Sequence, residues 1–218
     1  MDGLFSQLVA LGASAMLVTA LIVLWRRGVP AYITAYRWQS WLLGGITACV
    51  GYFGGEPQLY AVAVALILLK GVAIPFLLRA MERRFGAQHE LRPYVNTETS
   101  LLVAGLLVLF AYALARPLVA ATVLPTRVGL PLAMALLFVS LFIIVSRKKA
   151  ITQVLGFLML ENAIALLAVV GTYGVPLLVE FGVFLDALMG FLVMQIFIYQ
   201  IHETFDTIDV EQLRRLKH

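Results

Sequence analysis

Long runs of apolar residues alternate with short polar segments along the whole chain. Seven runs are long enough to cross a bilayer as helices, and we predict spans over residues 4–25, 39–54, 58–78, 100–116, 128–145, 150–172 and 176–201. The second span has an alternative start near Ala31, which would put Pro30 in the first helical turn, where proline is tolerated. The runs are continuous rather than alternating with period two, so helices are predicted and β-barrel strands are not.

Basic residues sort to one side of these seven spans. With the N-terminus outside, the inner segments hold 13 Lys and Arg residues and the outer segments hold two, Arg116 and Arg127. Lys70 lies within a span and belongs to neither side. Trp38 and Trp41 fall at the predicted inner interface, where amphipathic rings are common. This asymmetry predicts an outside N-terminus and a cytoplasmic C-terminus.

Composition agrees with an all-α polytopic membrane bundle. Of the 218 residues, 62% are hydrophobic and 13% are charged, whereas soluble domains average about 45–50% and about 25%. The net charge of +4 is typical of cytoplasmic loops, so no nucleic-acid partner is expected. One cysteine and three scattered histidines give no metal-ligand spacing, and no phosphate loop, nucleophile motif or haem ligand pair occurs. We therefore expect no cofactor and no redox or hydrolytic site in this chain.

The predicted organisation has three parts. Residues 1–127 form four N-terminal transmembrane helices, with a basic cytoplasmic loop near residues 79–97. Residues 128–203 form a unit of three helices, and residues 204–218 form a cytoplasmic tail. Asn96 and Thr97 are candidate caps for the fourth helix.

Carboxylates inside the last two predicted spans are the first candidates for function. A charged group at the bilayer centre costs roughly 2.5–3.5 kcal/mol on insertion scales, so such groups usually have a function. Glu161 lies midway along the sixth span, beside Asn162, and Asp186 lies near the middle of the seventh. The turn between the spans is tight, so both acids can face one polar cavity. Glu161 is either a protonatable relay group or a paired carboxyl that only pins helices together, and we favour the relay.

Three further positions are candidates for the same path. Glu180 is nearer the outer surface than Asp186, and a proton exit role and simple solvation are equally compatible with it. His202 and Glu203 lie at the inner end of the last span, where they form either a proton uptake group or, as we favour, a plain interfacial pair.

Lys70 is the one basic residue in the middle of a span. A lysine at this depth needs a carboxylate partner or water, unless it extends along the helix to a surface. Gly71 and Pro75 follow it, and Pro75 has no N–H to donate to the carbonyl of Gly71. A helix break beside a buried lysine is found in transporters, so we favour a role for Lys70 on an ion path.

Two short motifs carry a family resemblance. GFLMLEN (residues 156–162) and DALMG (residues 186–190) resemble the small three-helix K-type subunit of respiratory complex I and related subunits of multisubunit cation/proton antiporters. In that family each of two helices carries a glutamate on the proton route. Asp186 matches the second, with aspartate for glutamate. Glu161 comes three residues after the first, which keeps the helix face and shifts the depth by about 4.5 Å.

Over its whole length the chain resembles the hydrogenase-4 component E family, whose last three of seven helices are similar to the K-type subunit. The resemblance implies a non-catalytic subunit in the membrane arm of a complex I-like NiFe hydrogenase or formate hydrogenlyase-type complex, in the bacterial cytoplasmic (inner) membrane. Its partners would be lipid, large antiporter-like membrane subunits and, indirectly, the hydrogenase peripheral arm. Glu161 and Asp186 would pass protons towards Lys70 or a neighbouring subunit.

Three other functions remain as alternatives. The chain can be a non-conducting scaffold that holds antiporter-like subunits, or a subunit of a multisubunit cation/proton antiporter. The third is a stand-alone carrier or seven-helix photoreceptor. The photoreceptor is disfavoured, because a retinal-binding lysine would be expected in the last helix and Lys70 is in the third. A carrier would transport as a single purified chain, and we expect this chain alone to be inert.

Overall fold

The computed structural model of the protein describes residues 2–26, 28–85, 95–148 and 150–173. All of them belong to one compact unit, Met1–Val183, and nearly all are helical. The α-helices are α1 (Asp2–Trp25), α2 (Val29–Gly54), α3 (Gln58–Leu68), α4 (Ile74–Phe85), α5 (Thr97–Ala121), α6 (Gly129–Ser146) and α7 (Ala150–Thr172). A π-helical turn, Leu69–Ala73, joins α3 to α4 without interrupting the helix, and a short 3-10 turn, Pro125–Val128, precedes α6.

The helix ends agree closely with the sequence prediction where the sequence has a clear turn or capping residue. The helices α1, α2 and α7 end at the predicted residues Trp25, Gly54 and Thr172. The predicted cap Asn96 accepts a hydrogen bond from the Thr99 N–H at 3.0 Å and starts α5. The longer alternative for the second span is confirmed, because α2 begins at Val29 with Pro30 in its first turn.

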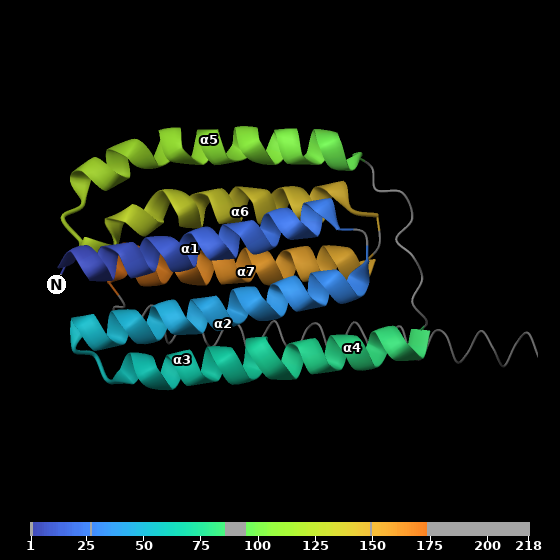
Figure 1. Ribbon diagram of the computed structural model, residues 1–218, viewed down its shortest axis with the longest axis horizontal. Coiled ribbons are helices and arrows are strands. Elements are labelled where there is room, and N and C mark those ends of the chain that lie inside the picture. Colours follow the sequence, from blue (N-terminus) through green and yellow to red (C-terminus); the bar gives the residue numbers. More distant parts are fainter. Residues whose placement is uncertain (1, 27, 86–94, 149, 174–218) are drawn as a thin grey trace, which may run out of the picture. The chain divides into compact units, whose positions relative to one another are not determined.

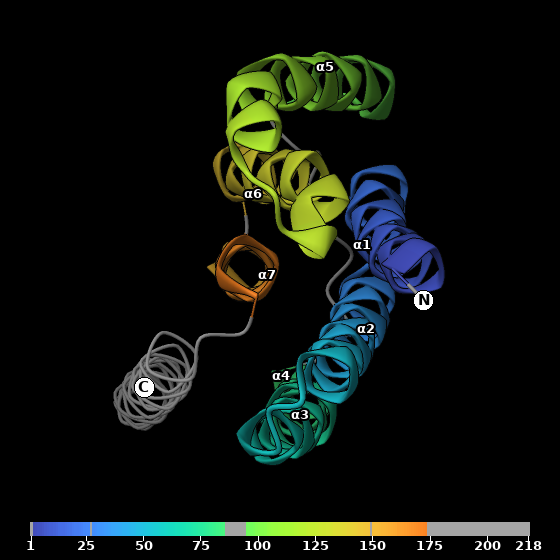
Figure 2. The same ribbon diagram turned by 90° about the vertical axis from the view of Figure 1, so that its left-hand side faces the viewer.

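Four helices form the centre of the described unit. The helix α1 packs against α2 and α6, and α7 also packs against both α2 and α6, so these four close a ring. The helix α5 lies on the far side of α6, and α3 lies on the far side of α2 (Figures 1 and 2). Large buried side chains fill the interior, among them Phe5, Met16, Tyr32, Tyr36, Leu43, Leu136 and Ile143.

Five segments among the described residues are long and apolar enough to cross a membrane. They are Gly3–Trp25, Gln58–Ala80, Thr97–Ala121, Pro125–Ser146 and Ile151–Thr172. The helix α2 has 26 residues, about 39 Å of helix, but is less apolar. Its polar side chains Gln39, Ser40 and Thr47 are fully buried inside the bundle. The seventh predicted span, 176–201, lies outside the described residues, so the count of seven and the terminal orientation remain predictions.

Glycines allow α2 and α3 to pack closely. A Cβ on Gly44 would lie 2.5 Å from Ile67 Cγ1, and one on Gly51 would lie 3.0 Å from Leu59 Cβ. The turn that follows α2 needs a glycine for a different reason. Gly55 has a φ of 72°, and its N–H bonds to the Gly51 carbonyl. The pair α2–α3 is thus fixed by backbone-to-side-chain contacts along its length.

Candidate functional site

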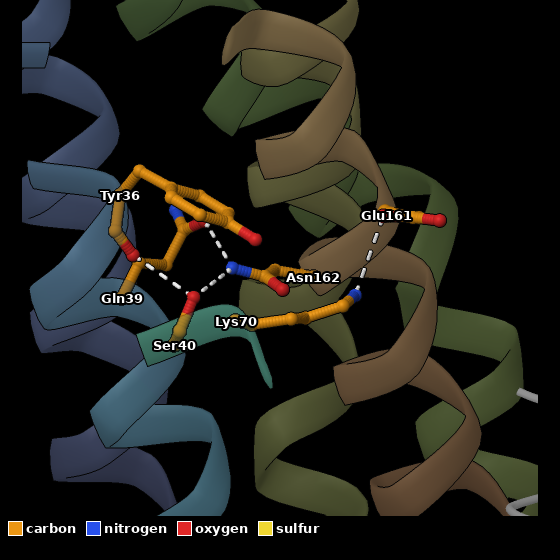
Figure 3. A network of polar contacts seen from close by, with 6 residues as sticks. All are labelled: Tyr36, Gln39, Ser40, Lys70, Glu161 and Asn162. Atoms are coloured by element: carbon orange, nitrogen blue, oxygen red, sulfur yellow. Dashed lines mark hydrogen bonds and ion pairs between the residues drawn. The ribbon is translucent and has the colours of Figure 1, made fainter. Parts of the chain in front are cut away.

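A buried ion pair joins Lys70 and Glu161, two of the residues singled out in the sequence. Lys70 Nζ lies 3.4 Å from Glu161 Oε2, and the two side chains are 1% and 9% exposed (Figure 3). Glu161 lies 11 residues from each end of α7, and Lys70 lies in the π turn Leu69–Ala73. The carboxylate partner that a mid-span lysine needs is therefore Glu161. The two residues come from different helices and, because they are paired, form a single ionisable centre inside the bundle.

The π turn shifts the buried face of the third span by one residue. Before the turn, the buried positions follow one α-helical face: Leu59, Ala63, Leu66 and Lys70. After it, a new face begins one residue late: Gly71, Pro75 and Leu78. An α-helix turns about 100° per residue, so the one extra residue in the π turn shifts the buried face from a row that ends at Lys70 to a row that begins at Gly71. The helix break predicted from Pro75 is thus a π turn that keeps the helix continuous.

The tryptophan Trp41 on α2 contacts this turn directly. Its Nε1–H donates to the Gly71 carbonyl oxygen at 3.2 Å. The ring occupies the space beside Gly71 in which a Cβ would collide with Trp41 Cδ1 and Nε1. The carbonyl that Pro75 leaves without its helical donor therefore has a donor from a neighbouring helix. Sequence reasoning placed Trp41 at an interface and did not find this contact.

A second polar group lies beside the ion pair and connects three helices. Asn162 Nδ2 donates to Gln39 Oε1 and to Ser40 Oγ, both at 3.1 Å. Gln39 Nε2 in turn contacts Thr19 Oγ1 and the Met16 carbonyl, both at 3.4 Å. The chain of contacts runs from α7 to α2, as Figure 3 shows, and continues from Gln39 to α1. Asn162 follows Glu161 directly, so the network fixes the part of α7 that carries the carboxylate.

Tyr36 completes the cluster on the α2 side. Its side chain is fully buried, and its backbone carbonyl accepts a hydrogen bond from Ser40 Oγ at 3.0 Å. In Figure 3 the hydroxyl end of its ring lies near Asn162. The amide oxygen of Asn162 is buried and accepts no hydrogen bond from the described residues. Tyr36, Gln39 and Ser40 were missed from the sequence because they are ordinary polar residues on a helix whose start was uncertain.

Another buried cation, Arg147, directly follows α6 and binds backbone carbonyls of α1. Its Nη2 donates to the carbonyls of Val23 and Leu24 at 2.7 and 3.3 Å, and its guanidinium lies 5.3 Å from the centre of the Tyr32 ring. These carbonyls are in the last turn of α1, where a helix lacks internal donors. Sequence analysis counted Arg147 as a loop residue, but it caps α1.

Four predicted site residues are not placed by the structure. Glu180, Asp186, His202 and Glu203 lie outside the described residues, so their contacts stay predictions. Within the ranges that are described, no three His, Cys, Asp or Glu side chains gather as a metal-binding group. The described part of the predicted path is therefore Lys70 with Glu161.

Comparison with known proteins supports a membrane protein of a shared family. No family model and no solved structure matches the chain. The chain is 35% identical over 214 residues to the uncharacterized protein Rv0085 of Mycobacterium tuberculosis (strain ATCC 25618 / H37Rv), covering 98% of this chain and 97% of that protein. It therefore belongs to the same family as Rv0085.

A more distant relative carries a functional name. The chain is 24% identical over 205 residues to hydrogenase-4 component E of Escherichia coli (strain K12), covering 94% of this chain and 95% of that protein. Hydrogenase-4 component E of Shigella flexneri matches to the same extent. The whole-length resemblance to the hydrogenase-4 component E family is thus supported as distant homology over nearly the whole chain.

Proposed function

We propose that the protein is a non-catalytic membrane-arm subunit of a complex I-like hydrogenase and that Glu161 and Lys70 belong to its proton, or cation, translocation path. Redox chemistry in partner chains would drive the translocation. The observation that carries the proposal is the Lys70–Glu161 pair, buried between helices of a strongly apolar bundle. The distant homology to hydrogenase-4 component E supports the kind of complex.

Energetics favour a functional pair over a structural one. Burying two charges costs several kcal/mol per ion, and replacing a buried pair with well-packed apolar residues is often neutral or stabilising. Stability alone therefore gives little reason to keep Lys70 and Glu161 inside the bundle. The separation of 3.4 Å exceeds the about 2.7–2.9 Å of a tight charge-assisted hydrogen bond. A loose pair can exchange partners more readily than a tight one.

The remaining members of the path come from the sequence. Asp186 is proposed as the second mid-membrane carboxylate and Glu180 as an outer group, whereas His202 with Glu203 is favoured as an interfacial pair, with proton uptake at the inner side as the alternative role. We further propose an inner-membrane location and large antiporter-like subunits as partners. Apolar side chains exposed on α5, such as Leu102, Leu106 and Leu109, are compatible with lipid or with such subunits.

The test is Glu161→Gln in the intact complex, with proton translocation measured per molecule of hydrogen evolved. We expect translocation to be lost while hydrogen evolution and assembly persist, because Gln keeps the shape of the side chain and cannot carry a proton. Glu98→Gln is the matched control, since Glu98 is exposed in the first turn of α5. Unchanged translocation in Glu161→Gln would remove Glu161 from the path.

A non-conducting scaffold is the second candidate, favoured by one observation. The contacts of Asn162 with Gln39 and Ser40 tie α7 to α2 directly beside the ion pair, as helix-pinning groups would. Under this function Glu161→Gln lowers the amount of assembled complex and leaves translocation per assembled complex intact. Co-purification of partner chains separates a hydrogenase from a multisubunit antiporter, the third candidate.

A further inference from the structure

We propose that Trp41 is a positioning residue for Lys70. Its indole N–H stabilises the π turn Leu69–Ala73 in the register that directs Lys70 towards Glu161. The consequence for translocation rests on the proposed function, whereas the positioning itself rests on the geometry of α2 and the π turn.

The first step concerns one backbone carbonyl. In a regular α-helix the Gly71 carbonyl would accept from the N–H of residue 75, but Pro75 has none. Trp41 Nε1 donates to this oxygen at 3.2 Å. In a membrane interior no water competes for the oxygen, so a donor from a neighbouring helix has a large effect on the local backbone. Trp41 therefore satisfies the group that distinguishes this turn from an α-helix.

The second step concerns shape. The Trp41 ring fills the volume in which any Cβ at position 71 would collide, so the contact needs a glycine on one helix and a flat ring on the other. One turn further along α2, the glycine is on α2 and the large side chain is on the third span: Ile67 packs against Gly44. One contact lies just before the π turn, at Ile67, and the other lies within it, at Gly71. Together they fix how far the third span can slide or rotate against α2.

The third step concerns rotation. Gly71, Pro75 and Leu78 are the buried face after the turn, and Lys70 ends the buried face before it. If the turn became α-helical while Gly71 stayed against Trp41, Lys70 would rotate by about 100° from that face. Its ammonium would then leave Glu161 and point away from the bundle interior. The π turn is thus what moves the buried face by one residue, so that Lys70 ends one buried face and Gly71 begins the next.

The fourth step concerns the choice of side chain. Trp38, one turn before Trp41 on α2, makes an edge contact with the Trp41 ring at 5.6 Å between ring centres. Within the described residues, the Trp38 indole donates no hydrogen bond to the turn. The two tryptophans therefore offer a matched pair of substitutions: Trp41→Phe removes the N–H at Gly71, and Trp38→Phe removes an N–H outside it.

The experiment measures the Lys70–Glu161 contact without relying on transport. The full chain is labelled with ¹⁵N-lysine and ¹³C-glutamate, placed in lipid bilayers and studied by magic-angle-spinning NMR. The unmodified chain is expected to give a cross-peak between a lysine Nζ and a glutamate carboxyl carbon, and Lys70→Met assigns it. We expect Trp41→Phe to lose this cross-peak and Trp38→Phe to keep it. Retention of the cross-peak in Trp41→Phe, or equal loss in both variants, overturns the proposal.

A second variant protects the test against simple unfolding. Pro75→Ala supplies the missing N–H within the helix, which favours an α-helical turn, so it should also lose the cross-peak while helical content by circular dichroism is unchanged. Retention of the cross-peak in Pro75→Ala contradicts the role of the free carbonyl. Translocation by complexes that contain Trp41→Phe is measured separately. A lost cross-peak with normal translocation supports the positioning role and contradicts the proposed function of the pair.

Discussion

Two buried cations in this protein are held in opposite ways. Lys70 is 1% exposed and faces a carboxylate, whereas Arg147 is 2% exposed and donates to backbone carbonyls at the end of α1. A guanidinium in a protein stays charged, and backbone carbonyls cannot take up a proton. A lysine beside a glutamate can share or transfer one. The comparison separates a fixed structural charge from an ionisable centre, although both are buried basic residues of one bundle.

The largest expected effect comes from breaking the ionisable centre on one side. Lys70→Met leaves the Glu161 carboxylate without its cation, and the free energy of unfolding should fall by about 3–5 kcal/mol. Adding Glu161→Leu should restore most of it, because no charge then remains unpaired. Unfolding by sodium dodecyl sulfate from mixed micelles measures both variants. Additive losses in the double variant would show that the two side chains do not interact.

Arg147→Leu should have a smaller effect of a different kind. The carbonyls of Val23 and Leu24 lose their donor, and an unsatisfied buried acceptor costs about 1–3 kcal/mol. No second substitution of an acid should restore this loss, since the acceptors are backbone groups. The same unfolding assay measures stability, and translocation per assembled complex should be unchanged. A loss of translocation without a loss of assembly would place Arg147 with the ionisable centre after all.

Asn162→Leu is expected to have the smallest effect on stability of the three, about 1–2 kcal/mol. It removes the two hydrogen bonds to Gln39 and Ser40 and keeps a side chain of similar size. Because Asn162 follows Glu161 on α7, translocation per hydrogen evolved should fall by a larger fraction than the free energy of unfolding does. The ratio of translocation to hydrogen evolution, compared with the unfolding assay, checks this. Equal, minor effects on both would make the network purely structural.

Much of the fold follows from the sequence because apolar runs, and the turn and capping residues that end them, are local signals. Trp25, Gly54 and Thr172 end helices as predicted, and Asn96 caps α5. Lys70 and Glu161 were found because a charge inside an apolar run is conspicuous. That they pair with each other was not predicted, since 91 positions separate them and no local pattern fixes which helices become neighbours.

The rest of the site escaped prediction for physical reasons. With the second span started at Gln39, Gln39 and Ser40 look like residues of a helix end, and Trp41 looks like an interfacial ring. Starting α2 at Val29 instead moves all three well into the helix. Pro75 signalled a break, but a proline alone does not determine whether the helix kinks or widens into a π turn.

The π turn also affects how this span tolerates the deletion of one residue. Removing one residue from a membrane helix normally rotates everything beyond it and ruins its packing. Here the deletion of Lys70 itself would join the faces ending at Leu66 and beginning at Gly71 with ordinary α-helical spacing. The shortened span should still insert and pack against α2, as protease protection and expression level can check. The π turn thus holds one residue more than the helix packing needs, and the side chain placed there is the lysine that pairs with Glu161.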